Sequence, residues 1–215
     1  MEKTGRVYYL NTIANTVTHG IGALLAVAGL VILVVYAAMQ GNAWHVVSFS
    51  IYGSTLVLMY FASNLYHSIQ KPRLKYIFRV IDHAAIFLLI AGTYTPFTLV
   101  TLQGTRGWTL FGIIWGLAFL GIFYKVFFIN RHPVISTLFY VLMGWLIVFS
   151  IGELLQSLPR NGLVLLGAGG LSYMLGIFFY AGRERLLMHA IWHLFVLGGS
   201  ICHYFAILFY VLPLK

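Results

Sequence analysis

The chain has 215 residues, of which 61% are hydrophobic and only 8% are charged. Soluble domains carry about 25% charged residues, so this composition excludes an ordinary soluble domain and indicates an integral membrane protein. The formal net charge of +9 is distributed over the ends of apolar segments rather than along one basic surface, which argues against nucleic-acid binding.

Seven apolar stretches are long enough for transmembrane helices, which need roughly 20 predominantly apolar residues. Each stretch is continuous rather than alternating, so the pattern predicts an all-α integral membrane protein, a seven-helix bundle forming a single domain over residues 1–215. Residues 1–11 are polar, and the first stretch is too long for a cleavable signal peptide. The expected spans are 12–39, 43–68, 77–100, 108–129, 134–157, 162–181 and 187–211.

Basic residues are concentrated on one side of the expected membrane. All but three of the 13 Lys and Arg residues fall on the side of the N-terminus, and the exceptions are Arg106, Arg160 and Lys215. The positive-inside rule therefore predicts a cytoplasmic N-terminus and a C-terminus outside. Basic inner loops also favour contact with anionic membrane lipids.

Two small features inside the spans predict local helix behaviour. Pro96 lies within the third span, where it is expected to kink or loosen the helix. Gly112 and Gly116 form a pair of small residues four apart in the fourth span, a pattern typical of a close helix contact.

Polar side chains recur at the cytoplasmic ends of four expected spans. Ionisable groups inside a bilayer are costly and usually functional, so a shared depth suggests one site. Asp82 opens the third span at this depth. Three further pairs each lie on one helix face because of their four-residue spacing: Asn15 and His19, Ser63 and His67, and His189 and His193.

The pair His189 and His193 could ligate one metal ion, as two histidines four apart do in the metalloprotease helix motif. Ala190 stands where that motif has glutamate, so a general base must come from elsewhere. Three imidazoles with one open position are typical of catalytic zinc, although imidazole also suits copper, iron and nickel. Zinc is the default because it needs no redox partner, whereas Asp82 as a direct ligand would indicate ferrous iron.

Simpler roles are open for several of these residues. Asp82 could pair with Arg79 three residues earlier, and Ser63 could bond to a backbone carbonyl. His83 is expected to face away from Asp82. Glu153 lies toward the outer side, where a hydrogen bond to another helix is the simplest account. His203 lies about 15 Å beyond His193 along the helix axis and either packs in the interior or lines a water-filled path.

These polar segments resemble the hemolysin III branch of the progestin and adipoQ receptor (PAQR) family, and distantly the alkaline ceramidases. The resemblance implies zinc held by His67, His189 and His193, with Ser63 and Asp82 beside the water that zinc would activate. It also implies a multi-pass protein of the bacterial plasma membrane. The matching segments are Asn15-Thr-Val-Thr-His19-Gly20, Ser63-Asn-Leu-Tyr-His67, residues 82–97 and residues 189–198.

One departure from the family pattern concerns the residues before the first matching segment. The family often has glutamate shortly before it, whereas this chain has Asn11 and Thr12. A role for an acidic residue there is therefore not expected. Asn15 and His19 are candidates for a supporting role behind the ligands.

Two functions follow from these interpretations. The first is a zinc-dependent, ceramidase-like hydrolase of a lipid amide or ester, with Asp82 transferring protons and Ser63 orienting water or substrate. The second is a non-enzymatic membrane-homeostasis regulator or receptor-like protein with structural zinc. A pore-forming hemolysin (cytolysis) ranks lowest, because the chain is constitutively polytopic. Membrane lipids are the expected partners, and the sequence indicates neither a substrate nor an oligomeric state.

Overall fold

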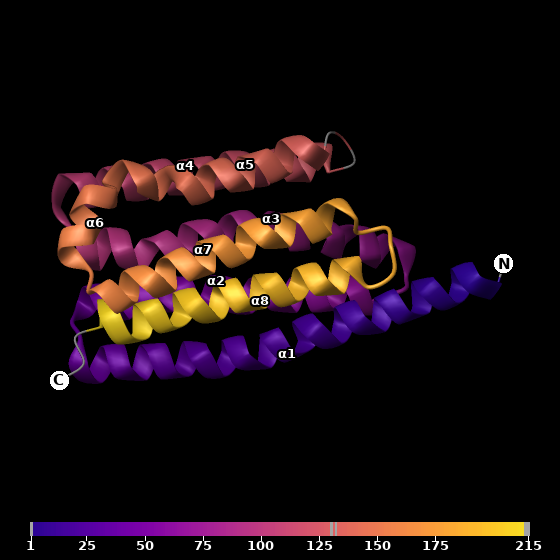
Figure 1. Ribbon diagram of the computed structural model, residues 1–215, viewed down its shortest axis with the longest axis horizontal. Coiled ribbons are helices and arrows are strands. Elements are labelled where there is room, and N and C mark those ends of the chain that lie inside the picture. The colour runs from indigo at the N-terminus through magenta and orange to yellow at the C-terminus, as the bar shows by residue number, and fades with distance from the viewer. Residues whose placement is uncertain (1, 130, 132, 213–215) are drawn as a thin grey trace.

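A computed structural model describes residues 2–129, 131 and 133–212; Lys215 and His132 lie outside this range. All regular secondary structure in the described residues is helical, and seven helical segments are long and apolar enough to cross a membrane. The predicted seven-span all-α architecture is therefore confirmed. The helices run side by side along the long axis, with the start of α1 and the end of η3 at opposite ends of the bundle (Figure 1).

Three kinds of span make up the bundle. Two spans change from α-helix to π-helix at one end: α3 (Pro72–Pro96) continues as η1 (Phe97–Leu102), and α8 (Met188–Ala206) as η3 (Ile207–Val211). The fifth span is divided into α5 (Pro133–Trp145), the 3-10 segment η2 (Leu146–Ser150) and α6 (Ile151–Ser157). The other four are single α-helices: α1 (Glu2–Gln40), α2 (Ala43–Ser68), α4 (Gly104–Phe128) and α7 (Arg160–Ala181).

Two of the changes of helix type have identifiable causes. The third span becomes a π-helix directly after Pro96, whose ring nitrogen cannot donate a backbone hydrogen bond, so the expected loosening takes this form. In the fifth span the Tyr94 hydroxyl accepts the N–H of Ile147 at 2.9 Å. It also lies 2.9 and 2.8 Å from the carbonyl oxygens of Met143 and Gly144. A side chain inserted among the backbone hydrogen bonds in this way interrupts the α-helix. The sequence had predicted one continuous span at 134–157, without this interruption.

Packing divides the bundle into two buried clusters. The larger cluster, which includes Phe49, Tyr60 and Ile207, lies where α1 packs against α2 and α8. The smaller cluster includes Phe87 and Met143 and joins α3 to α4 and α5. The candidate site residues lie at one end of the larger cluster.

The close approach of α4 to α3 occurs at a different glycine from the predicted pair. A Cβ atom on Gly112 or Gly116 would meet no heavy atom within 4 Å, so the prediction of a close contact there is wrong. A Cβ atom on Gly121 would instead lie 2.5 Å from Cδ1 and Cζ of Phe87. The Phe87 ring is fully buried and occupies the space that Gly121 leaves open.

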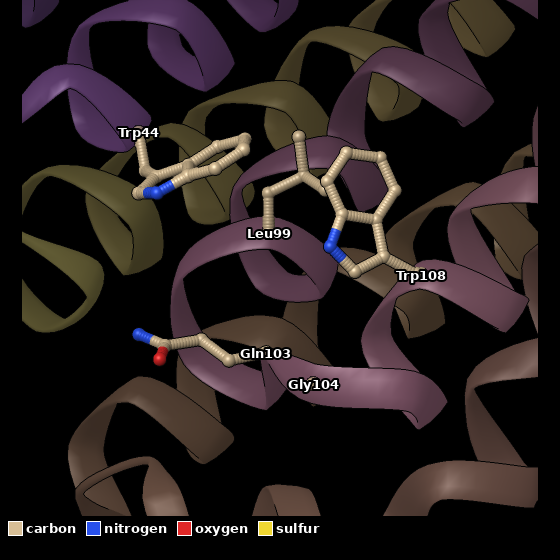
Figure 2. A pocket seen from close by; sticks show the side chains of 5 residues that line it. All are labelled: Trp44, Leu99, Gln103, Gly104 and Trp108. Carbon is tan, nitrogen blue, oxygen red and sulfur yellow. The ribbon is translucent and has the colours of Figure 1, made fainter.

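The end of the bundle opposite the start of α1 carries aromatic and paired polar side chains. Trp44 and Trp108 pack edge to face with ring centroids 5.7 Å apart, and they line a small cavity of about 150 Å³ (Figure 2). Aromatic side chains of this kind are typical of a membrane interface. Glu153 forms an ion pair with Arg106 at the start of α4, so it does reach another helix.

Candidate metal centre

Three imidazoles meet near the end of the bundle at which α1 begins. His67 lies in the last turn of α2, and His189 and His193 lie one turn apart at the start of α8. The ligand nitrogens of the three residues lie within 4.8 Å of one another. The ring centroid of His67 is 5.1 Å from each of the other two, which are 4.6 Å apart. Two spans distant in sequence therefore form a group that could hold a metal ion.

The chemistry of this group fits a transition metal. Nε2 of His67 and Nε2 of His193 are buried and have no hydrogen-bond partner among the described residues. An unpaired buried polar atom costs about 1–3 kcal/mol, and a bound ion or water commonly accounts for one in a native protein. Neutral imidazole nitrogens are zinc ligands, and they also bind other first-row metals.

Asp82 is not part of the group of three histidines. The described residues that could share one ion are the three histidines, which does not support the iron site with Asp82 as a direct ligand. The Asp82 side chain is only 13% exposed and interacts with the Ser63 side chain. Ser63 precedes His67 by one helical turn, so it connects the carboxylate to the helix face that carries His67.

The surroundings of Asp82 differ from the sequence expectation in two ways. His83 was expected to face away, but its Nδ1 lies 3.4 Å from Oδ2 of Asp82. The same nitrogen lies 2.8 Å from the Arg79 carbonyl oxygen, one turn earlier on the helix. Lys125 of α4 is only 3% exposed and interacts electrostatically with Asp82. Its position inside the expected span 108–129 marks it as a charge within the membrane, but the sequence does not indicate its partner.

Helix α1 closes the site on the side of His193. His19 is buried and stacks on His193, with ring centroids 3.5 Å apart and an interplanar angle of 16°. Both ring nitrogens of His19 and Oδ1 of Asn15 are buried without a hydrogen-bond partner among the described residues. His19 and Asn15 thus lie next to the three-histidine group, and their supporting role stays a prediction.

Two further contacts from α1 reach α8 and were missed by sequence reasoning. Thr18 Oγ1 lies 3.1 Å from Nδ1 of His193. Oδ1 of Asn11 accepts the N–H of Leu187 at 2.7 Å, immediately before α8 begins. Leu187 has a left-handed φ of 61°, so Asn11 holds an unusual turn two residues before His189. Neither contact had a signal in the sequence beyond proximity to Asn15.

A second polar cluster continues from the site along α8. Oγ of Ser200 lies 2.9 Å from the hydroxyl oxygens of both Tyr60 and Tyr173. Nε2 of His203 lies 3.1 Å from the carbonyl oxygen of Leu166 on α7. His203 is buried and therefore packs in the interior, where it joins α7 to α8.

Comparison with known proteins identifies the family. Residues 7–204 match the family described as Haemolysin-III related. The chain belongs to the haemolysin III family. Its predicted resemblance is confirmed, and with seven spans it is an integral, multi-pass protein of a bacterial plasma membrane.

Members of this family from bacilli are similar over almost the whole chain. Hemolysin-3 of Bacillus cereus is 51% identical over 201 residues, covering 94% of this chain and 92% of the relative. The Hemolysin-3 homolog of Bacillus subtilis (strain 168) is 49% identical over 198 residues, covering 92% and 93%. The more distant Monocyte to macrophage differentiation factor of Homo sapiens, a PAQR-type protein, is 29% identical over 201 residues, covering 90% and 82%. No solved structure matches the chain.

Proposed function

We propose that this haemolysin III family member is a zinc-dependent hydrolase that cleaves an amide or ester bond of a membrane lipid. The observation that carries the proposal is the meeting of His67, His189 and His193. Asp82 interacts with Ser63, which lies one helical turn before His67. Three histidine ligands leave one position open in the tetrahedral coordination that catalytic zinc prefers. When bound, zinc supplies a Lewis acid that polarises a carbonyl group and activates water at neutral pH.

The polar residues beside the histidines would move and orient protons. Asp82 accepts a proton from the attacking water and returns it to the leaving group, a role that contributes about 10²–10⁴-fold in rate. Ser63, which interacts with the Asp82 carboxyl group, would orient it. Lys125 provides a positive charge on the side of α4, close to the carboxylate.

The position of the group favours a lipid substrate. The three histidines lie near the end of apolar helices, the depth at which lipid head groups meet the acyl region. Aromatic rings of Tyr66, Tyr180 and Trp192 lie 4.6, 6.1 and 5.0 Å, centroid to centroid, from the nearest site histidine. Amphipathic rings are well suited to this boundary, because one edge is apolar and the other polar.

A regulator with structural zinc is the second candidate. The ligands come from α2 and α8, which also meet where Tyr60 donates to Ser200 at 2.9 Å. An ion shared by the two helices would strengthen this contact without any reaction. A cytolytic role has no support in the geometry of the described residues, and we do not propose it.

Zinc content and lipid turnover together test the proposal. Purified wild type, His193→Ala and Asp82→Asn would be reconstituted in nanodiscs made from total bacterial lipid, and released fatty acids measured by mass spectrometry. His203→Ala is the matched control, because it removes a buried histidine of the same helix outside the three-histidine group. We expect zinc in every variant except His193→Ala.

Fatty acid release separates the two candidates. We expect release by wild type and His203→Ala, and a release rate about 10²–10⁴-fold lower for Asp82→Asn. Equal zinc content in wild type and His193→Ala would refute the metal site. Normal zinc content with no more fatty acid from wild type than from Asp82→Asn would refute hydrolysis and leave the structural role.

A further inference from the structure

Thr18 lies between the backbone of α1 and the imidazole of His193. Its Oγ1 is 2.8 Å from the carbonyl oxygen of Ala14 and 3.1 Å from that of Asn15. On the other side, the same oxygen is 3.1 Å from Nδ1 of His193. The Asn15 carbonyl oxygen also lies close to the His193 ring.

These contacts favour one position for the hydrogen on the His193 ring. The Thr18 hydroxyl has one hydrogen, and its nearest acceptor is the Ala14 carbonyl oxygen at 2.8 Å, so we infer that it donates to the backbone of α1. Oγ1 then offers only lone pairs to the ring, and Nδ1 of His193 must be the donor. A neutral imidazole has one N–H, so Nε2 carries a lone pair. Nε2 is the buried nitrogen without a partner among the described residues.

We propose that Thr18 is a positioning residue that holds His193 as the Nδ1–H tautomer and directs the Nε2 lone pair toward the metal. Histidines that bind metals commonly donate their other N–H to a neighbouring acceptor, which fixes the tautomer and the ring orientation. The inference rests on the metal site of the proposed function but not on lipid hydrolysis.

Two residues of α1 restrict the orientation of the His193 ring in different ways. His19 stacks on His193 at 3.5 Å and so restricts the ring plane. Thr18 approaches Nδ1 and so restricts rotation of the ring about its bond to Cβ. His193 is fully buried, whereas His67 and His189 are partly exposed. Water is therefore least available to satisfy the second nitrogen of His193, and the protein supplies the acceptor.

The expected effect is a loss of metal affinity. Removing a partner of this kind typically weakens binding 10–100-fold. We expect the lower end of that range, about tenfold, for Thr18→Val, because the Asn15 carbonyl remains as a second acceptor. Thr18→Ser keeps the hydroxyl and should keep the affinity close to that of wild type.

The experiment measures the zinc affinity of the purified full-length protein by competition with a fluorescent chelator. Thr16→Val is the matched control, because Thr16 is half-buried on α1 but residues two apart do not share a helix face. Loss of affinity in Thr18→Val alone supports the proposal. Wild-type affinity in Thr18→Val, or an equal loss in Thr18→Ser or Thr16→Val, overturns it.

A second measurement needs no variant. Nitrogen NMR of the metal-free protein, labelled with ¹⁵N in its histidines, reports which nitrogen of His193 carries hydrogen. Hydrogen on Nδ1 is expected, and hydrogen on Nε2 overturns the proposal. A wild type that binds zinc but releases no fatty acid rejects hydrolysis and leaves this inference standing. Fatty acid release by wild type together with unchanged zinc affinity in Thr18→Val supports hydrolysis and rejects the inference about Thr18.

Discussion

The contact between Gly121 and Phe87 predicts that Gly121→Ala destabilises the bundle. The new methyl group would lie 2.5 Å from Cδ1 and Cζ of the Phe87 ring. The ring cannot easily retreat, because it is fully buried and packs against Phe139 and Tyr140 at centroid distances of 5.5 and 4.4 Å. Overpacking of this kind costs about 1–3 kcal/mol.

Gly112→Ala is the matched comparison on the same helix. A Cβ atom there meets open space, so this variant receives the helix-propensity gain of about 1 kcal/mol and no steric cost. Both variants receive that gain, so the difference in their unfolding free energies isolates the overpacking cost of about 1–3 kcal/mol. Circular dichroism during unfolding in mixed detergent micelles measures the difference. A Gly112→Ala protein as unstable as Gly121→Ala would refute the reasoning and favour the contact predicted from sequence.

Three further outcomes concern stability. A chelator should lower the melting temperature of wild type but not of His193→Ala, since zinc at 100 times its Kd contributes about 2.7 kcal/mol; an equal shift in both would contradict the ligand set. Ser200→Ala should cost about 1–3 kcal/mol in micelle unfolding, because the hydroxyls of Tyr60 and Tyr173 lose a buried partner. In the same assay Arg106→Ala should cost at most about 1 kcal/mol, because its side chain is 74% exposed.

The seven spans could be predicted because each must place about 20 predominantly apolar residues in the lipid. The second span was expected at 43–68, and the helix runs from Ala43 to Ser68. The third span was expected to begin at residue 77, but its helix begins at Pro72. The first turn of this helix is basic, and a hydropathy pattern does not distinguish a polar helical turn from a loop. The break in the fifth span depends on a hydroxyl from another helix, which no local pattern contains.

The sequence predicted the depth of the site in the membrane and some of its residues. The four-residue spacing of His189 and His193 and the depth of His67 placed three imidazoles at one level, and the structure brings them together. The neighbours Thr18 and Lys125 could not be assigned, because their contacts depend on how α1 and α4 are rotated about their axes. That rotation is set by tertiary packing rather than by hydropathy.

The Tyr94 hydroxyl that interrupts the helix of the fifth span has a consequence for how the protein is assembled. The 13 residues of α5 reach about 20 Å at 1.5 Å per residue, too short to cross a hydrocarbon layer of about 30 Å. A nascent fifth segment that leaves the translocon before meeting α3 has no water and no tyrosine to pair its amides. The change to a 3-10 helix at Leu146–Ser150 therefore depends on contact with α3, and we expect it to form only when the two helices pack together.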